Sequence, residues 1–208
     1  IDKKVILGKR IKSHYPTFTK EKDIKGLLLS IDEYEGDIST QYALKILPYL
    51  FVRSFNLRNM LWNEIDLTNK KWTIPANKMK IKKEFTLPLP DQVIDLLKEI
   101  KDYNEDSIFV FPGLRSRNKP ISDNTLISAL RRMGYSKDEF VPHSFISVFS
   151  TIAYENFRKH GHNGEVIEAL LAHVENNKVK EAYNRAKYEL PMKELIQWYA
   201  NYLDKIKV

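Results

Sequence analysis

One short stretch of this chain departs from the helical spacing of apolar residues that governs most of the rest. Residues 72–74 and 85–89 read as two strands, and the Ile-Asp-Leu sequence at 65–67 leads into the first of them. The connection between the two strands carries four lysines, Lys78, Lys80, Lys82 and Lys83. The pattern predicts a small antiparallel ribbon with a very basic connection.

Apolar residues elsewhere recur at helical intervals. We expect helices over 20–29, from Ser39 or Thr40 to 51, and over 56–62, 91–103, 122–133, 142–153, 165–172, 178–186 and 192–203. Pro48 predicts a kink or a break, Pro142 suits the first turn of its helix, and Gly134 follows a helix end. Residues 108–111 predict a short strand ending at Pro112, and 113–120 a basic loop. The expected fold class is α+β, mainly α, with a small three-stranded antiparallel sheet at one edge.

Length and composition narrow the function classes. A chain of 208 residues with 43% hydrophobic residues supports one sizeable domain, or a large domain with a small appendage. The absence of cysteine excludes disulfides, thiolate zinc sites and a cysteine nucleophile. The sequence contains no run of about 18 apolar residues, so no membrane span is expected. The net charge of +7 permits a polyanionic partner such as nucleic acid.

The N-terminal end carries neither an initiator methionine nor a signal peptide, since the chain starts Ile-Asp-Lys-Lys. We therefore expect a fragment of a longer protein that was cut at a domain boundary. Residues 1–35 are expected to form a connector with a short helix, and residues 36–208 the main domain.

Two basic residues stand in positions with both a structural and a functional interpretation. Arg53 follows an apolar run, where an arginine either bonds the last carbonyls of a helix or serves a site. Lys80 lies in the basic connection, which is either a solvated, edge-protecting turn or a phosphate-contacting one. Composition does not choose between these interpretations.

The histidines and one tyrosine are similarly ambiguous. His143 starts a helix and His173 ends one, which is typical of caps and dipole partners. Tyr183 follows His173 by ten positions in a helical segment, where a tyrosine is usually packed in the core or half-buried. The five histidines, including His160 and His162, have no metal-ligand spacing, so no metal site is expected.

The order of these residues carries a resemblance. An arginine, a lysine in a ribbon, a histidine opening a helix, a second histidine and a tyrosine follow one another along the chain. The sequence from about Gly36 to Leu203 thereby resembles the catalytic domain of tyrosine recombinases, specifically bacteriophage and genomic-island integrases. Residues 51–67 resemble the first arginine motif, 72–89 the lysine hairpin, 143–151 the His-x-x-Arg helix, and 170–186 the terminal His and Tyr motif.

The resemblance implies a reaction and a set of roles. A tyrosine attacks a DNA phosphate and forms a 3′-phosphotyrosine, so neither metal nor other cofactor is implied. Tyr183 would be the nucleophile, Arg53 a phosphate clamp and Lys80 the general acid. His143 and His173 would move protons or contact phosphate. The DNA-contacting residues would be Lys78, Lys82 and Lys83, with Arg115 and Arg117 on the basic loop.

The resemblance also implies partners and a location. The partner would be a double-stranded DNA attachment site, bound by a tetramer that is monomeric without DNA, in the bacterial cytoplasm and away from membranes. The N-terminal arm-and-core-binding domain of such proteins would be missing from this fragment. The last helix could dock on a neighbouring protomer, although its single apolar stripe favours packing on its own core.

Two positions depart from the family pattern. Ile146 occupies the second arginine position, and Asn56 stands where relatives usually have an acidic residue after the first arginine. Arg131 and Arg132 could compensate only if folding brings them in, and Arg158 lies about three turns beyond Ile146. Three functions remain open: an active or weakly active integrase domain, a degenerate module that binds DNA without cutting it, and an unrelated helical DNA-binding regulator.

Overall fold

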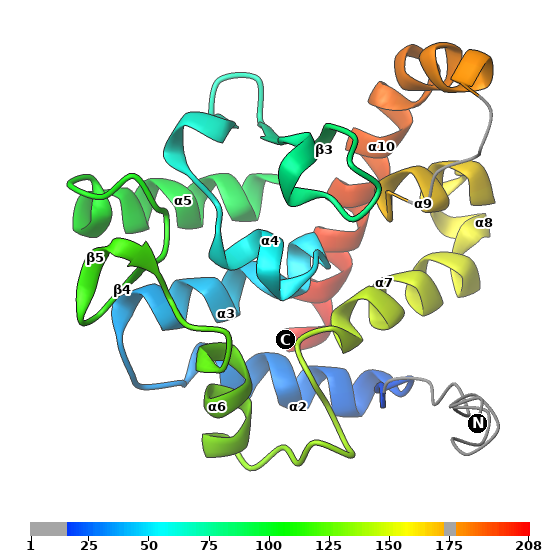
Figure 1. Ribbon diagram of the computed structural model, residues 1–208. Coiled ribbons are helices and arrows are strands. Elements are labelled where there is room, and N and C mark those ends of the chain that lie inside the picture. Colours follow the sequence, from blue (N-terminus) through cyan, green and yellow to red (C-terminus); the bar gives the residue numbers. More distant parts are fainter. Residues whose placement is uncertain (1–15, 173–177) are drawn as a thin grey trace, which may run out of the picture.

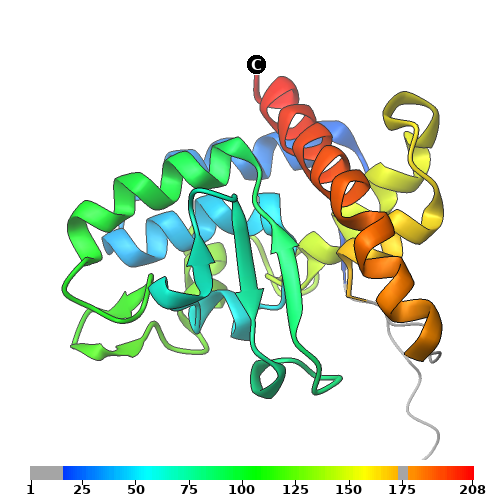
Figure 2. The same cartoon turned by 90° about the horizontal axis from the view of Figure 1, so that it is seen from above.

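The computed structural model describes residues 16–172 and 178–208, with the side chains of 178–187 outside that description. A three-stranded antiparallel sheet lies against a group of helices (Figures 1 and 2). Its strands are β1 (Ile65–Asp66), β2 (Lys71–Ile74) and β3 (Phe85–Pro88), in the order β1-β2-β3. The predicted ribbon and the predicted α+β class, mainly helical, are confirmed.

Strand alternation fixes which face of the sheet enters the core. Trp72 pairs with Leu87 and Ile74 pairs with Phe85. Trp72, Ile74 and Leu87 are buried, because alternate residues of a strand point to the same face. The sheet therefore presents one apolar face to the helices, and the β2–β3 connection projects beyond it (Figure 2).

The core is built around the helix α3 (Ile38–Leu50), whose last five residues are all buried. It packs against α2 (Glu21–Asp32), α5 (Asp91–Asn104) and α10 (Lys178–Lys207). Helix α2 buries Ile24, Leu27 and Ile31 in the same core. The segment expected to be a connector thus contributes to the main packing unit.

The ends of α3 correct two expectations. Its N-cap is Asp37, whose carboxylate accepts a hydrogen bond from the Thr40 amide at 3.3 Å, and not Ser39 or Thr40. A carboxylate at the N-terminus satisfies a free amide and complements the helix dipole. Pro48 does not break α3, which continues to Leu50.

The middle of the chain differs most from expectation. Residues 108–111 contribute only an isolated bridge, between Leu61 and Phe109. The strands are instead β4 (Pro112–Gly113) and β5 (Ser116–Pro120), so the predicted basic loop is a two-stranded hairpin. Proline is tolerated here because both strands are at the edge of a two-stranded sheet.

The remaining short elements are α4 (Ser54–Arg58), a 3-10 turn (Trp62–Glu64), a second 3-10 turn (Ala76–Lys78), α6 (Thr125–Arg132), α7 (Ser144–Glu155), α8 (Phe157–His160) and α9 (Gly164–Leu170). Among them, α4, α6, α7 and α9 overlap predicted helices, while the two 3-10 turns and α8 were not predicted. Gly134 follows α6 with a φ of +94°, the left-handed conformation expected of a glycine after a helix end. Pro142 precedes α7 and does not lie in its first turn, because His143 is the N-cap.

Helix α10 replaces two predicted helices with one. It spans 30 residues and contains Pro191. Its C-terminal half buries Leu195, Tyr199 and Leu203 against the rest of the same chain, so the prediction that this stripe packs on its own core is confirmed. Among the described residues no helix combines the length and apolar character that a membrane span requires.

Candidate active site

The chain reversal between α3 and α4 positions Arg53. Phe51 ends α3 in a left-handed conformation, with a φ of 41°, and its amide donates to the Leu47 carbonyl at 2.9 Å. The Phe51 ring is buried and stacks on Phe149 of α7 with centroids 3.6 Å apart. A left-handed residue other than glycine costs roughly 1–2 kcal/mol. The buried stacking offsets that cost, and Arg53 follows as the N-cap of α4.

Arg53 and His143 line one small cavity of about 100 Å³. His143 reaches it from the start of α7, Met79 from the β2–β3 connection and Ala172 from the end of α9. The rest of the lining is mostly apolar and includes Val52, Ile74, Phe85, Ile146, Leu170 and Leu171. Two of the sequence-predicted site residues are therefore brought together.

Electrostatics distinguish these two groups. Burial, and then the positive charge of Arg53, lower the pKa of His143 below its ordinary value near 6.5. Its imidazole is therefore neutral at neutral pH and able to accept a proton. Within the part of the chain that the structure describes, the Arg53 guanidinium makes no hydrogen bond or ion pair, so it does not cap the last carbonyls of α3.

Ile146, which departs from the family pattern in the sequence, lies at this cavity in the structure. Its side chain lines the cavity beside Arg53 and His143, where the family pattern has an arginine. Arg131 donates to the Phe140 carbonyl at 3.0 Å and so holds a loop instead. Arg158 is exposed on α8, 5.7 Å from the Phe157 ring. Arg53 is the only arginine among the described residues that line the cavity.

The lysines of the β2–β3 connection differ in their surroundings. Lys80 lies in an exposed turn directly after Met79, and Lys82 is exposed with a φ of 54°. Lys83 is half-buried. Lys78 points inward, where its ammonium forms an ion pair with Glu64 and donates to the Asn59 carbonyl at 2.6 Å. Lys78 therefore has a structural role that its spacing did not reveal.

The two arginines of the β4–β5 hairpin also differ. Arg115 is exposed at the hairpin turn. Arg117 forms an ion pair with Asp106 and donates to the Tyr103 carbonyl at 2.9 Å, which fastens the hairpin to the end of α5. This hydrogen-bonded pairing lowers the pKa of Asp106. The Arg117 charge is thus already partnered within the protein.

His173 lies outside the described residues. Tyr183 lies within α10, in the part whose side chains are not described. The N-terminal turns of α10 reach toward the same side of the molecule as the β2–β3 connection (Figure 2). The described side chains contain no group of three or more histidine and carboxylate residues that could hold a metal ion.

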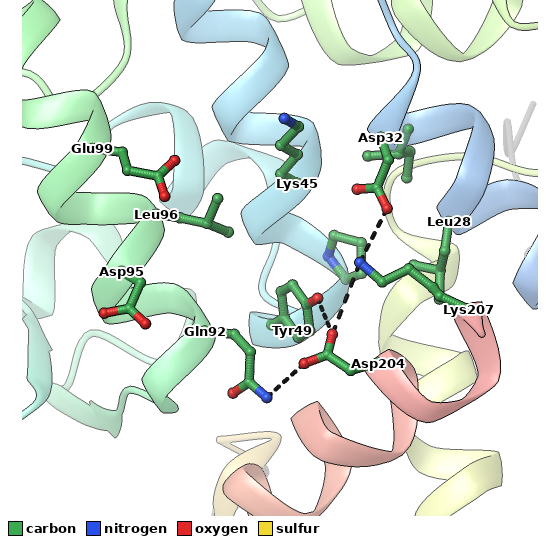
Figure 3. Close-up of a pocket in the computed structure, with 12 residues that line it drawn as sticks. Leu28, Asp32, Lys45, Tyr49, Gln92, Asp95, Leu96, Glu99, Asp204 and Lys207 are labelled. Atoms are coloured by element: carbon green, nitrogen blue, oxygen red, sulfur yellow. Dashed lines mark hydrogen bonds and ion pairs between the residues drawn. The ribbon is translucent and has the colours of Figure 1, made fainter.

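A second cavity, of about 300 Å³, lies between α2, α3, α5 and α10 and shares no lining residue with the first (Figure 3). Asp204 accepts hydrogen bonds from Tyr49 and, at 2.8 Å, from Gln92. Lys207 donates to Asp32 at 3.1 Å. Burial and the bond to Asp204 raise the pKa of Tyr49. These paired groups anchor the end of α10 to the core.

Comparison with other proteins places this arrangement in a family. A model of the phage integrase family matches residues 17–189. The prophage integrase IntS of Escherichia coli (strain K12) is 34% identical over 195 residues, and so is the integrase of Shigella phage Sf6. Each match covers 93% of this chain and 49% of the relative. The chain therefore spans about half the length of these relatives.

Solved structures show the same fold at lower identity. The integrase of mycobacterium phage Brujita superimposes with a TM-score of 0.59 at 16% identity, over 92% of this chain and 62% of that one. XerA recombinase gives a TM-score of 0.58 at 17% identity, over 86% of this chain and 66% of that one. The family model and the sequence matches show that the chain belongs to the phage integrase family.

Proposed function

We propose that this chain is the catalytic part of a tyrosine recombinase that breaks and rejoins DNA at a specific site. The observation that carries the proposal is the cavity that joins Arg53 to His143 beside the loop bearing Lys80. A guanidinium without a protein partner among the described residues is suited to clamp two phosphate oxygens. The neutral imidazole next to it is suited to proton transfer.

The proposed step needs no external energy source, because one phosphorus–oxygen bond forms as another breaks. The Tyr183 hydroxyl gives up its proton to a neutral histidine, for which His143 and His173 are the candidates. Its oxygen then forms a bond to phosphorus while the bond from phosphorus to the 5′ oxygen breaks. Lys80 protonates the departing 5′ oxygen, and Arg53 stabilises the charge on the phosphoryl oxygens. Attack of another 5′ hydroxyl on the phosphotyrosine reverses these transfers and joins a new strand.

Double-stranded DNA is the proposed partner. A DNA-bound relative in fold is XerH recombinase, whose complex with a palindromic difH substrate superimposes with a TM-score of 0.56 over 82% of this chain. Exposed cations Lys80, Lys82 and Arg115, together with Lys83, lie on segments that project from the core. Lys78 and Arg117 support DNA binding less directly, because their charges hold the loop and the hairpin in place.

Assembly and location follow as parts of the same proposal. Recombination joins two DNA sites, so we propose a tetramer on DNA that separates into monomers without it. We place the reaction in the bacterial cytoplasm, where the DNA lies. The proposed division of the chain keeps residues 36–208 as the catalytic unit, to which α2 adds core contacts.

A second candidate function is favoured by Ile146. An isoleucine donates no hydrogen bond to phosphate, and arginines that stabilise phosphoryl-transfer charge are worth about 10³–10⁵ in rate. A module that binds the DNA site and does not cleave it would keep Arg53 and the basic loop and tolerate Ile146. The two candidates predict the same binding and different covalent chemistry.

The test uses a nicked duplex that carries the site selected from a random DNA library by binding. Cleavage near the nick releases a short strand, so the covalent protein–DNA adduct accumulates. We expect a slow adduct with the natural sequence and a faster one with Ile146→Arg, because the added guanidinium restores a second phosphate clamp. Binding should weaken steeply with salt in both proteins.

Each outcome decides between the candidates. Adduct formation by the natural protein supports the recombinase, whereas an adduct from Ile146→Arg alone means that the natural chain binds the site and that Ile146 prevents cleavage. Binding to the selected site without any adduct, from the natural protein and from Ile146→Arg alike, favours the binding module. Binding that does not depend on salt contradicts both.

A further inference from the structure

Asn56 joins the helix that starts at Arg53 to the loop that carries Lys80. The residue is only 3% exposed. Its side-chain amide donates to the Lys78 carbonyl at 3.3 Å and reaches the Met79 sulfur at 3.5 Å. Met79 is itself buried and lines the Arg53–His143 cavity. The loop is thus held at the residue immediately before Lys80.

A second set of contacts holds the same loop from the other side. The Lys78 ammonium donates to the Asn59 carbonyl at the end of α4 and pairs with Glu64. Glu64 also accepts a hydrogen bond from the Trp72 indole in β2 at 3.1 Å. These contacts fix the base of the loop, and Asn56 alone among the described side chains of α4 reaches its Lys78–Met79 segment by hydrogen bonds.

We infer that Asn56 is a positioning residue, whose amide holds the β2–β3 connection against α4 so that Lys80 is placed relative to Arg53. This inference rests on the proposed function, in which Lys80 protonates the leaving 5′ oxygen. Asn56 lies three residues after Arg53, about one helical turn. One turn of helix, one hydrogen bond to the Lys78 carbonyl and two residues of the loop therefore connect Arg53 to Lys80. An acidic side chain, the usual residue here in the family pattern, has no proton to donate to the Lys78 carbonyl when it is ionised.

The first test does not depend on catalysis. Backbone hydrogen exchange in the free protein should quicken across residues 78–84 in Asn56→Ala and in Asn56→Asp, including at the Lys82 amide, which bonds the Met79 carbonyl at 3.0 Å. Asn59→Ala is the matched control, because the Asn59 side chain donates only to the Phe55 carbonyl within α4. Unchanged exchange in both Asn56 variants overturns the inference.

The second test isolates the proton that Lys80 supplies. One DNA substrate has the ordinary bridging 5′ oxygen, and the other has sulfur there, which leaves as a thiolate without protonation. At saturating DNA, Asn56→Ala should slow adduct formation on the oxygen substrate by about 10², within the range of general-acid effects, and leave the sulfur substrate near the natural rate. Asn56→Gln, which keeps an amide donor, should recover part of the loss.

The outcomes separate the inference from the proposed function. Equal slowing on the oxygen and sulfur substrates means that Asn56 only supports the fold, and this overturns the positioning role. If the natural protein and Ile146→Arg cleave neither substrate, the proposed function fails and the catalytic role of Asn56 fails with it. Hydrogen exchange still decides whether Asn56 holds the loop.

Discussion

The two cavities of this protein each have a cationic side chain in their lining, Lys207 in one and Arg53 in the other, and these two cations differ in how they are partnered. Between α2, α3, α5 and α10, the charged and polar groups Asp32, Tyr49, Gln92, Asp204 and Lys207 are joined to one another. In the smaller cavity, the Arg53 guanidinium has no hydrogen bond or ion pair within the described chain. Burial of the neighbouring His143, and then the Arg53 charge, lower the pKa of that histidine.

This difference distinguishes polar groups that hold the fold together from a polar group that is available to bind a ligand. Paired groups satisfy one another and hold elements together, which is the usual outcome for polar groups that folding buries. A cation without a partner among the described residues, next to a neutral imidazole, is suited to bind an anion. Under the proposed function, the smaller cavity receives the phosphate, whereas the paired groups of the larger one attach α10 to the core.

The largest expected effect contrasts one residue from each cavity. Arg53→Ala should slow adduct formation at saturating DNA by about 10³–10⁵, the range seen when a phosphoryl-stabilising arginine is lost. Its free energy of unfolding should change little, by roughly 0.5 kcal/mol or less, because no bond within the described chain is lost. Quench-flow adduct assays and urea unfolding measure the two quantities.

Asp204→Ala should show the reverse pattern. Removing the carboxylate leaves the hydroxyl of the buried Tyr49 without its acceptor, a loss of about 1–2 kcal/mol. Adduct formation per bound DNA should stay unchanged. If Asp204→Ala slows the chemistry as much as Arg53→Ala does, the division between the two cavities is wrong.

An effect of intermediate size concerns the pH dependence of folding stability, and it follows from the proximity of Arg53 and His143. The pKa of His143 in the folded protein lies below the unfolded value near 6.5. As the pH is lowered, the unfolded chain therefore protonates this histidine at a higher pH than the folded protein does. Stability is then full above about pH 6.5 and falls as the pH drops through the folded pKa. His162, whose pKa is also lowered by burial, contributes in the same direction.

Arg53→Ala should raise the pKa of His143, because it removes a positive neighbour, while burial still keeps the pKa below its ordinary value. Titration of the His143 ring proton by NMR measures this shift, and the His162 resonance in the same spectra serves as the control. An unchanged His143 pKa in Arg53→Ala would mean that the two side chains do not sense each other.

The smallest expected effect lies on α10, between the two cavities. Tyr199 is buried against Phe51 and Phe149, and its hydroxyl has no hydrogen-bond partner among the described residues. Tyr199→Phe should leave the free energy of unfolding unchanged or raise it by about 1 kcal/mol, since an unsatisfied buried group is removed. Tyr49→Phe, which loses the bond to Asp204, is the matched comparison and should destabilise the protein in urea unfolding.

The elements predicted well are those governed by apolar spacing. The ribbon and α5 follow from alternation and from a single apolar face, which local sequence displays. The hairpin formed by β4 and β5 was missed, because β4 consists of a proline and a glycine, and β5 is polar and ends in a second proline. The continuity of α10 through Pro191 was missed because packing of the following turns outweighs a local helix-breaking signal.

The site was predictable to a different degree. The resemblance indicated Arg53 and His143, and the structure places both at one cavity, while their roles stay a prediction. The inward turn of Lys78 and the pairing of Arg117 were not visible, because their partners Glu64 and Asp106 lie 14 and 11 residues away and are brought close only by the fold. The hydrogen bonds of Asn56 to the lysine loop were hidden for the same reason.

The central claim is that Tyr183 and the Arg53–His143 cavity act on one phosphate. It is tested most directly by locating the attached nucleotide on the protein after reaction with the nicked duplex, using protease digestion and mass spectrometry. The account predicts a 3′-linked nucleotide on the peptide containing Tyr183, none with Tyr183→Phe, and far less with Arg53→Ala. A nucleotide on another residue, or an adduct that persists in Tyr183→Phe, would contradict it.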